Sequence, residues 1–94
     1  MTVDETRLSR IETALRTALA PSSLSLVDES HLHRGHAGAA SGRGHYRVRV
    51  VSAAFSGKAP LARHRQVYSA LGALMETDIH ALSIEALSPD EATA

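Results

Sequence analysis

Hydrophobic and polar residues alternate most clearly between His45 and Ser52, in the run H-Y-R-V-R-V-V-S. Successive side chains of a β-strand point to opposite faces, so this run predicts a strand with an apolar face and a basic face. We expect the apolar face to pack on helices and the basic face to meet water. The apolar row is Tyr46, Val48 and Val50, and the basic row is His45, Arg47 and Arg49.

Two further stretches alternate with the same period. Ser22 to about Asp28 contains Ser-Leu-Ser-Leu and predicts a short strand, and Ile79 to Leu87 predicts a third one. Ser88-Pro89-Asp90-Glu91 then has the form of a capping box. Since only three residues follow it, we expect a helix of one turn at most there.

Apolar residues recur with helical spacing in two other regions. The first helix follows a capping box at Thr2 and Glu5, and Ala20-Pro21 ends it because proline cannot continue the hydrogen-bond ladder. The second helical region begins at Pro60, with a break expected near its start. The predicted core residues are Leu8, Ile11, Leu15, Ala18 and Leu19 in the first, and Leu61, His64, Val67, Tyr68, Leu71, Leu74 and Met75 in the second.

This order predicts a mixed three-stranded sheet in one domain, with a core at about residues 4–87 and a short tail at 88–94. The first two strands can form an antiparallel hairpin, and the helical crossover favours a parallel pair of the second and third strands. A parallel pair would bring the starts of these two strands to the same edge. His36, His45 and His80 are therefore expected to converge at one rim of the sheet.

The stretch Ser30–His45 predicts a loop, because it holds four of the six glycines together with four of the six histidines. His31-x-His33-x-x-His36 could bind zinc, but a glycine-rich loop does not preorganise a tetrahedral site and residues 30–45 contain no acidic residue. Solvated loop histidines are the favoured interpretation for His31 and His33. The chain has no cysteine, so it can bind a metal only through imidazole and oxygen, or with ligands from a partner.

Basic residues are concentrated in the middle of the chain, although the net charge is zero. Residues 30–65 include seven Lys or Arg and no acidic residue, which favours an anionic partner such as an acidic protein face, a bound anion or nucleic acid. A solvated basic face without a partner is the alternative. The candidate residues are Arg47, Arg49, Lys58, Arg63, His64 and Arg65, of which His64 also fits a structural role on the core-facing side of its helix.

Catalysis and membrane insertion find no support in the sequence. The basic middle offers no carboxylate to orient a histidine next to a serine nucleophile, and neither phosphate-loop glycine pattern is present. The chain has no apolar run that could span a bilayer and its start does not resemble a secretory signal, so we expect a cytoplasmic, non-enzymatic protein.

Several separated motifs together resemble the BolA family. They are D-E-S-x-x-x-x-G-H from Asp28, G-H-Y-R-V-R-V-V-S from Gly44, F-S-G from Phe55, R-H-R-Q-V-Y from Arg63, I-H-A-L from Ile79 and S-P-D-E from Ser88. The resemblance implies a KH-like α/β fold of class II (α-β-β-α-α-β), in which helices pack on one face of a three-stranded mixed sheet. The G-x-x-G loop by which KH domains bind nucleic acid is absent here.

The resemblance also implies a partner and a cofactor. BolA-like proteins pair with monothiol glutaredoxins around a bridging [2Fe-2S] cluster, to which the glutaredoxin cysteine and a glutathione thiol give two ligands. The positions carried over for the other two are His80 and His36, with His33 as the alternative in the loop. On this basis the isolated chain is expected to be a metal-free monomer. Family members are also credited with DNA binding, which here would use Arg47, Arg49, Arg63 and Arg65.

Overall fold

The computed structural model describes residues 7–29 and 44–93. The capping box predicted at Thr2 and Glu5 and the loop residues His31, His33 and His36 lie outside these ranges. Within the described ranges, eight elements follow one another: α1 (Arg7–Leu19), β1 (Ser23–Asp28), β2 (Gly44–Val51), the 3₁₀ turn η3 (Ala53–Phe55), α3 (Pro60–Leu71), α4 (Leu74–Thr77), β3 (Ile79–Leu87) and α5 (Pro89–Thr93).

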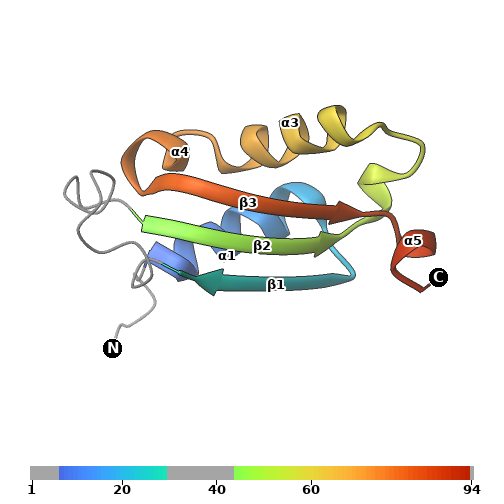
Figure 1. The fold of residues 1–94 in the computed structure, drawn as a ribbon, viewed down its shortest axis with the longest axis horizontal. Coiled ribbons are helices and arrows are strands. Elements are labelled where there is room, and N and C mark those ends of the chain that lie inside the picture. The colour runs from blue at the N-terminus through green and yellow to red at the C-terminus, as the bar shows by residue number, and fades with distance from the viewer. Residues whose placement is uncertain (1–6, 30–43, 94) are drawn as a thin grey trace.

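The three strands form one mixed sheet in the order β1-β2-β3. Leu26 of β1 lies opposite Val48 in an antiparallel pair, and Val48 lies opposite Ile84 of β3 in a parallel pair. The predicted topology is thus confirmed. The crossover through α3 and α4 supplies the helical connection that a parallel pair requires (Figure 1).

The core lies between the sheet and the two long helices. Tyr46, Val48 and Val50 of β2 are buried, whereas Arg47, on the other side of the strand, is exposed, as the alternation predicted. The sheet residues pack with α1 and α3, so the helices cover one face and leave the other open (Figure 1). The fully buried or nearly buried residues contributed by the two helices are Ile11, Leu15, Leu19, Val67 and Leu71.

The prediction for the core-facing side of α3 is confirmed for Val67 and Leu71 and is wrong for Leu61 and Tyr68. Arg63, Val67 and Leu71 are its buried residues, whereas Leu61 and Tyr68 are 62% and 43% exposed. The sequence was ambiguous because apolar residues occupy both sides of this helix. The break was also misplaced, since Gly72 separates α3 from α4 at the far end, with a φ of 54° that favours glycine.

Arg63 is buried rather than part of an exposed basic surface, which corrects its prediction as a partner-binding residue. Its guanidinium donates to the carbonyls of Lys58 and Ala86 and to the carboxylate of Glu91. Glu91 also accepts from the amide of Ser88, which is the bond that the glutamate of the predicted capping box is expected to make. Arg63 thereby connects α3 to the end of β3 and to α5.

The Glu91 pair predicts a pH dependence of stability. The hydrogen bonds from Arg63, with a further one from Ser88, lower the pKa of Glu91 from 4.5 to about 2. A carboxylate with a lowered folded-state pKa stabilises the fold above its unfolded pKa, and this contribution is lost as the pH falls from about 4.5 towards 2. In thermal unfolding across this pH window, the melting temperature of the wild type should fall more steeply than that of Glu91→Gln.

Glu12→Gln is the matched control, because Glu12 forms an exposed i,i+4 pair with Arg16 on α1. This variant should keep the wild-type pH profile. Parallel profiles for the wild type and Glu91→Gln would contradict the assignment of the acid-sensitive pair to α5.

Candidate metal centre

A β-bulge at the start of β3 determines where His80 lies. Gly44 pairs with Ile79 and His45 pairs with Ala81, so His80 is the additional residue on β3. Ile79 and Leu82 both pack on the core although they are three residues apart, which regular alternation would not allow. The bulge therefore shifts the phase of the strand, and His80 is exposed at the sheet edge.

His80 lies next to His45 at this edge. Their ring centroids are 5.1 Å apart and the rings are tilted by 49°. His45 is 9% exposed, so one imidazole of the pair is nearly buried and the other is open to solvent. We call this pair the histidine rim. The predicted convergence is confirmed for His45 and His80, while His36 lies outside the described residues.

Gly44 allows the chain to pass close to Tyr46 before it reaches His45. A Cβ atom at Gly44 would lie 2.6 Å from the Tyr46 ring, so any larger residue would displace a buried side chain. The amide of Gly44 donates to the carbonyl of Asp78 (2.9 Å), and the amide of Glu29 donates to the carbonyl of His45 (2.8 Å). These bonds attach the start of β2 to its neighbours on both sides.

An ion cluster secures the start of β3 to α1. The carboxylate of Asp78, two residues before His80, accepts hydrogen bonds from Arg10 (2.6 Å), Arg7 (3.2 Å) and Thr77 (2.6 Å). The bonds from Thr77 and Arg10 lower the pKa of Asp78, so it stays ionised at neutral pH. The sequence offered no signal for this cluster, because the two arginines are 71 and 68 residues away from Asp78.

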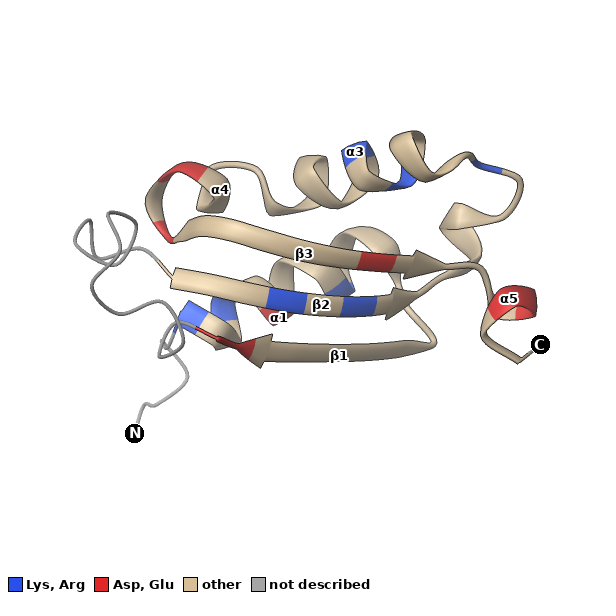
Figure 2. Cartoon of the chain, in the orientation of Figure 1, with Lys and Arg blue, Asp and Glu red and all other residues tan. Residues whose placement is uncertain are grey.

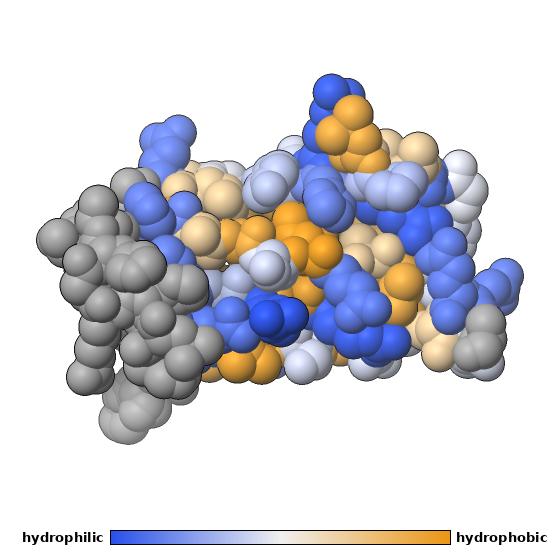
Figure 3. All heavy atoms as spheres, in the orientation of Figure 1, coloured by the Kyte–Doolittle hydropathy of each residue, from blue (hydrophilic) through white to orange (hydrophobic). Residues whose placement is uncertain are grey.

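The basic face of β2 is largely neutralised by neighbouring carboxylates. Arg47 pairs with Glu29 (2.9 Å) and Arg49 pairs with Glu85 (3.3 Å), each through Nε. Basic residues on β2 accordingly lie beside an acidic residue of β3 (Figure 2), and hydrophobic areas interrupt the hydrophilic surface of this face (Figure 3). The distribution of charges along the sequence did not reveal this pairing, because both glutamates lie outside residues 30–65.

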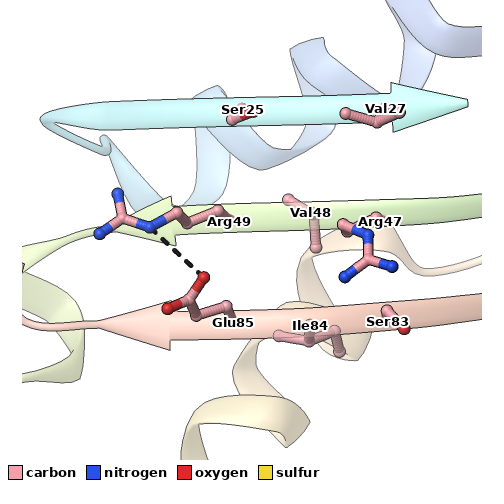
Figure 4. A pocket seen from close by; sticks show the side chains of 8 residues that line it. All are labelled: Ser25, Val27, Arg47, Val48, Arg49, Ser83, Ile84 and Glu85. Carbon is pink, nitrogen blue, oxygen red and sulfur yellow. Dashed lines mark ion pairs between the residues drawn. The ribbon is translucent and has the colours of Figure 1, made fainter.

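The open face of the sheet carries a shallow depression of about 340 Å³. Arg47 points across it towards Ser83, and Arg49 lies beside Glu85 (Figure 4). None of the described residues that line it is aromatic, so they offer no platform on which a base could stack. The lining residues are Ser25, Val27, Arg47, Val48, Arg49, Ser83, Ile84 and Glu85.

The remaining basic candidates lie around α3. Lys58 and Arg65 are exposed, and neither forms an ion pair with another described residue. His64 is half-buried on α3, which fits the structural role better than a position on an open binding surface.

The histidine rim can supply part of a coordination shell. Within residues 7–29 and 44–93, no group of three or more His, Asp or Glu side chains is arranged to bind a metal. The rim offers the exposed imidazole of His80, with the nearly buried His45 beside it, and imidazole is a ligand of iron in clusters that combine histidine with thiolate ligands. These residues therefore fit a cluster that is completed by thiolates from another molecule.

Comparison with protein families gives a match to the BolA-like protein family over residues 15–91. A curated relative from Escherichia coli K12, the DNA-binding transcriptional regulator BolA, is 44% identical over 75 residues, which are 80% of this chain and 69% of that protein. An uncharacterised Sinorhizobium protein is 41% identical and is covered over 91% of its length. By contrast, the chain spans 56% of the length of the chloroplastic BOLA1 protein of Arabidopsis thaliana.

Solved structures with the same fold include the BolA domain of SufE1 from Arabidopsis thaliana. That domain is 38% identical, with a TM-score of 0.80 over 92% of this chain and 95% of the other. Yeast Fra2 is 25% identical, with a TM-score of 0.61 over 98% of this chain and 85% of the other. No helix within the described residues is long and apolar enough to cross a membrane.

Proposed function

The chain belongs to the BolA-like family, and from that premise we propose that it is a non-enzymatic partner of a monothiol glutaredoxin. In this function it shares a [2Fe-2S] cluster with the glutaredoxin and its bound glutathione, for iron–sulfur trafficking or for iron and redox regulation. The observation that carries the proposal is the histidine rim, where a β-bulge presents an exposed imidazole at the end of the sheet.

The chain's own residues would divide the work at this rim. His80 is the proposed ligand from β3, and His36, with His33 as the alternative, is the proposed ligand from the loop. His45 packs beside His80 and restricts its ring, while the Asp78 ion cluster secures the start of β3. The [2Fe-2S] cluster would supply a redox-active pair of irons. Its reduction potential is raised when histidines replace two thiolates.

A [2Fe-2S] cluster that is held partly by an exposed histidine is better suited to transfer to another protein than to storage. The chain would contribute two imidazoles, His80 from the rim and one histidine from the loop, and it has no cysteine, so the remaining ligands must come from the partner. A histidine ligand must be deprotonated to bind, so cluster retention should weaken as the pH falls through the range in which imidazole is protonated. On the same reasoning, the isolated chain is a metal-free monomer.

Co-expression with a monothiol glutaredoxin tests this proposal. The two chains should co-purify as a heterodimer with a visible absorption spectrum and an electron paramagnetic resonance signal that differ from those of the glutaredoxin alone. A glutaredoxin whose active-site cysteine is replaced by serine should lose the cluster. If the wild-type chains neither associate nor change the spectrum, the proposal fails.

DNA binding is the second candidate function, and the name of the Escherichia coli relative favours it. Three of the four arginines first assigned to it are engaged elsewhere, since Arg47 and Arg49 pair with glutamates and Arg63 is buried. Lys58 and Arg65 are the described cations left for phosphate contacts. Affinity for a labelled duplex should then fall only shallowly with salt, because the slope reflects the number of phosphates neutralised.

A further inference from the structure

The outward face of α3 carries a row of side chains that the core does not use. Leu61, Arg65 and Tyr68 are spaced i, i+4 and i+7, so they lie on one side of the helix, opposite the buried Arg63 and Val67. Leu61 is 62% exposed and Tyr68 is 43% exposed. We call these three residues the outer stripe.

Exposed apolar side chains are concentrated on this stripe. Among the described residues, the exposed large hydrophobic side chains are Leu61, Tyr68 and Val27. Val27 lies on the opposite side of the sheet from α3. Single exposed apolar residues need no explanation, but Leu61 and Tyr68 lie on one helical row with Arg65 between them.

Positive charge without a local counter-charge lies in the same place. Six of the eight described Lys and Arg residues form ion pairs, and the two that do not are Arg65, in the stripe, and Lys58, just before α3. The helix itself contains no acidic residue. The net charge of the stripe and its N-terminal flank is therefore positive, although the whole chain is neutral.

We propose that the outer stripe, with Lys58, is a docking surface for an acidic amphipathic helix of a partner protein. Tyr and Arg are enriched in the central contacts of protein interfaces, and an exposed leucine gains most when another apolar side chain covers it. The stripe spans about 10 Å along a straight helix, which suits the packing of a second helix along it. Carboxylates beside the apolar row of that helix would pair with Arg65 and Lys58.

This surface goes beyond the proposed cluster function, because none of its residues belongs to the histidine rim. Nucleic acid fits it less well. Phosphates would engage Lys58 and Arg65 but would leave Leu61 exposed, and the stripe holds one aromatic side chain rather than a row on which bases could stack.

A nuclear magnetic resonance titration of the isotope-labelled full chain tests the proposal. The probe is a peptide of about four helical turns that carries leucines along one face with flanking glutamates. A peptide with lysine in place of glutamate and a short DNA duplex serve as comparison ligands. We expect saturable amide shifts in residues 58–72 with the acidic peptide, and no saturable shifts there with the basic peptide or the duplex.

Four variants separate charge from apolar contact. Arg65→Glu should weaken acidic-peptide binding about tenfold, and Leu61→Ser should weaken it several-fold. Arg16→Glu and Val27→Ser make the same chemical changes elsewhere on exposed surfaces, and they should leave the affinity unchanged. All four sites are exposed enough for the fold to be retained, which the amide spectra report directly.

Three outcomes would overturn the proposal. Absence of saturable shifts in α3 with the acidic peptide is one, and equal weakening by the control variants is another. The third is that the duplex binds more tightly than the acidic peptide, and that Arg65→Glu abolishes duplex binding whereas Leu61→Ser does not. This result would assign the surface to nucleic acid.

Discussion

Replacing His80 by alanine should abolish the cluster signal of the co-expressed heterodimer. His80 is exposed on a β-bulge, so its removal deletes the proposed ligand without opening a cavity in the core. The absorption and electron paramagnetic resonance spectra of the purified complex should revert to those of the glutaredoxin alone. The unfolding free energy of the isolated variant should stay within about 0.5 kcal/mol of the wild type, as for other exposed substitutions.

His64→Ala is the matched control, because it removes a half-buried imidazole on α3 and should leave the cluster spectrum unchanged. His36→Ala should reproduce the loss seen for His80→Ala, whereas His33→Ala should not. If His80→Ala retains the wild-type spectrum, the assignment of the β3 ligand fails. If His45→Ala loses the cluster while His36→Ala keeps it, the second ligand is the neighbour of His80 rather than a loop residue.

Replacing Phe55 by alanine should destabilise the fold by about 3–5 kcal/mol, a large part of the roughly 5–15 kcal/mol available to a small domain. Phe55 is fully buried, although it lies in the three-residue turn η3. Ser52 donates from Oγ to the carbonyl of Leu19 (2.6 Å) and accepts from the amide of Ala54, while Gln66 donates to the carbonyl of Ala54. These bonds secure the turn to α1 and α3, so the surroundings cannot easily collapse into the cavity.

Urea denaturation measures this loss, and Leu61→Ala is the control. Leu61 is also a large apolar residue, but at 62% exposure its truncation should change the unfolding free energy by no more than about 0.5 kcal/mol. Equal destabilisation by the two variants would show that Phe55 does not anchor the core.

The strands and their pairing could be predicted because both depend on short-range patterns. Alternation over residues 45–52 identified the buried face of β2, and the crossover rule identified β3 as its parallel neighbour. The same topology predicted that His45 and His80 lie at one edge of the sheet, where their rings are found side by side. The family motifs also lie in these elements and were visible in the sequence.

The orientation of α3 could not be predicted with the same rule. Its apolar residues lie on both sides of the helix, so the period alone did not show that Arg63, and not Leu61, would face the core. Arg63 can be buried because two carbonyls and Glu91 satisfy its guanidinium, and these partners lie up to 28 residues away. From the sequence alone, Arg63 is therefore expected at the surface.

By itself, then, the sequence determined the fold class, the directions of strand pairing and the convergence of two histidines, because local periodicity and chain connectivity suffice for them. Only the tertiary structure decided that a bulge exposes His80, that carboxylates neutralise Arg47 and Arg49, and that positive charge remains on α3. The physical reason is distance along the chain. Each of these features depends on contacts between elements that are far apart in sequence. A local sequence pattern does not show which basic and acidic side chains form ion pairs.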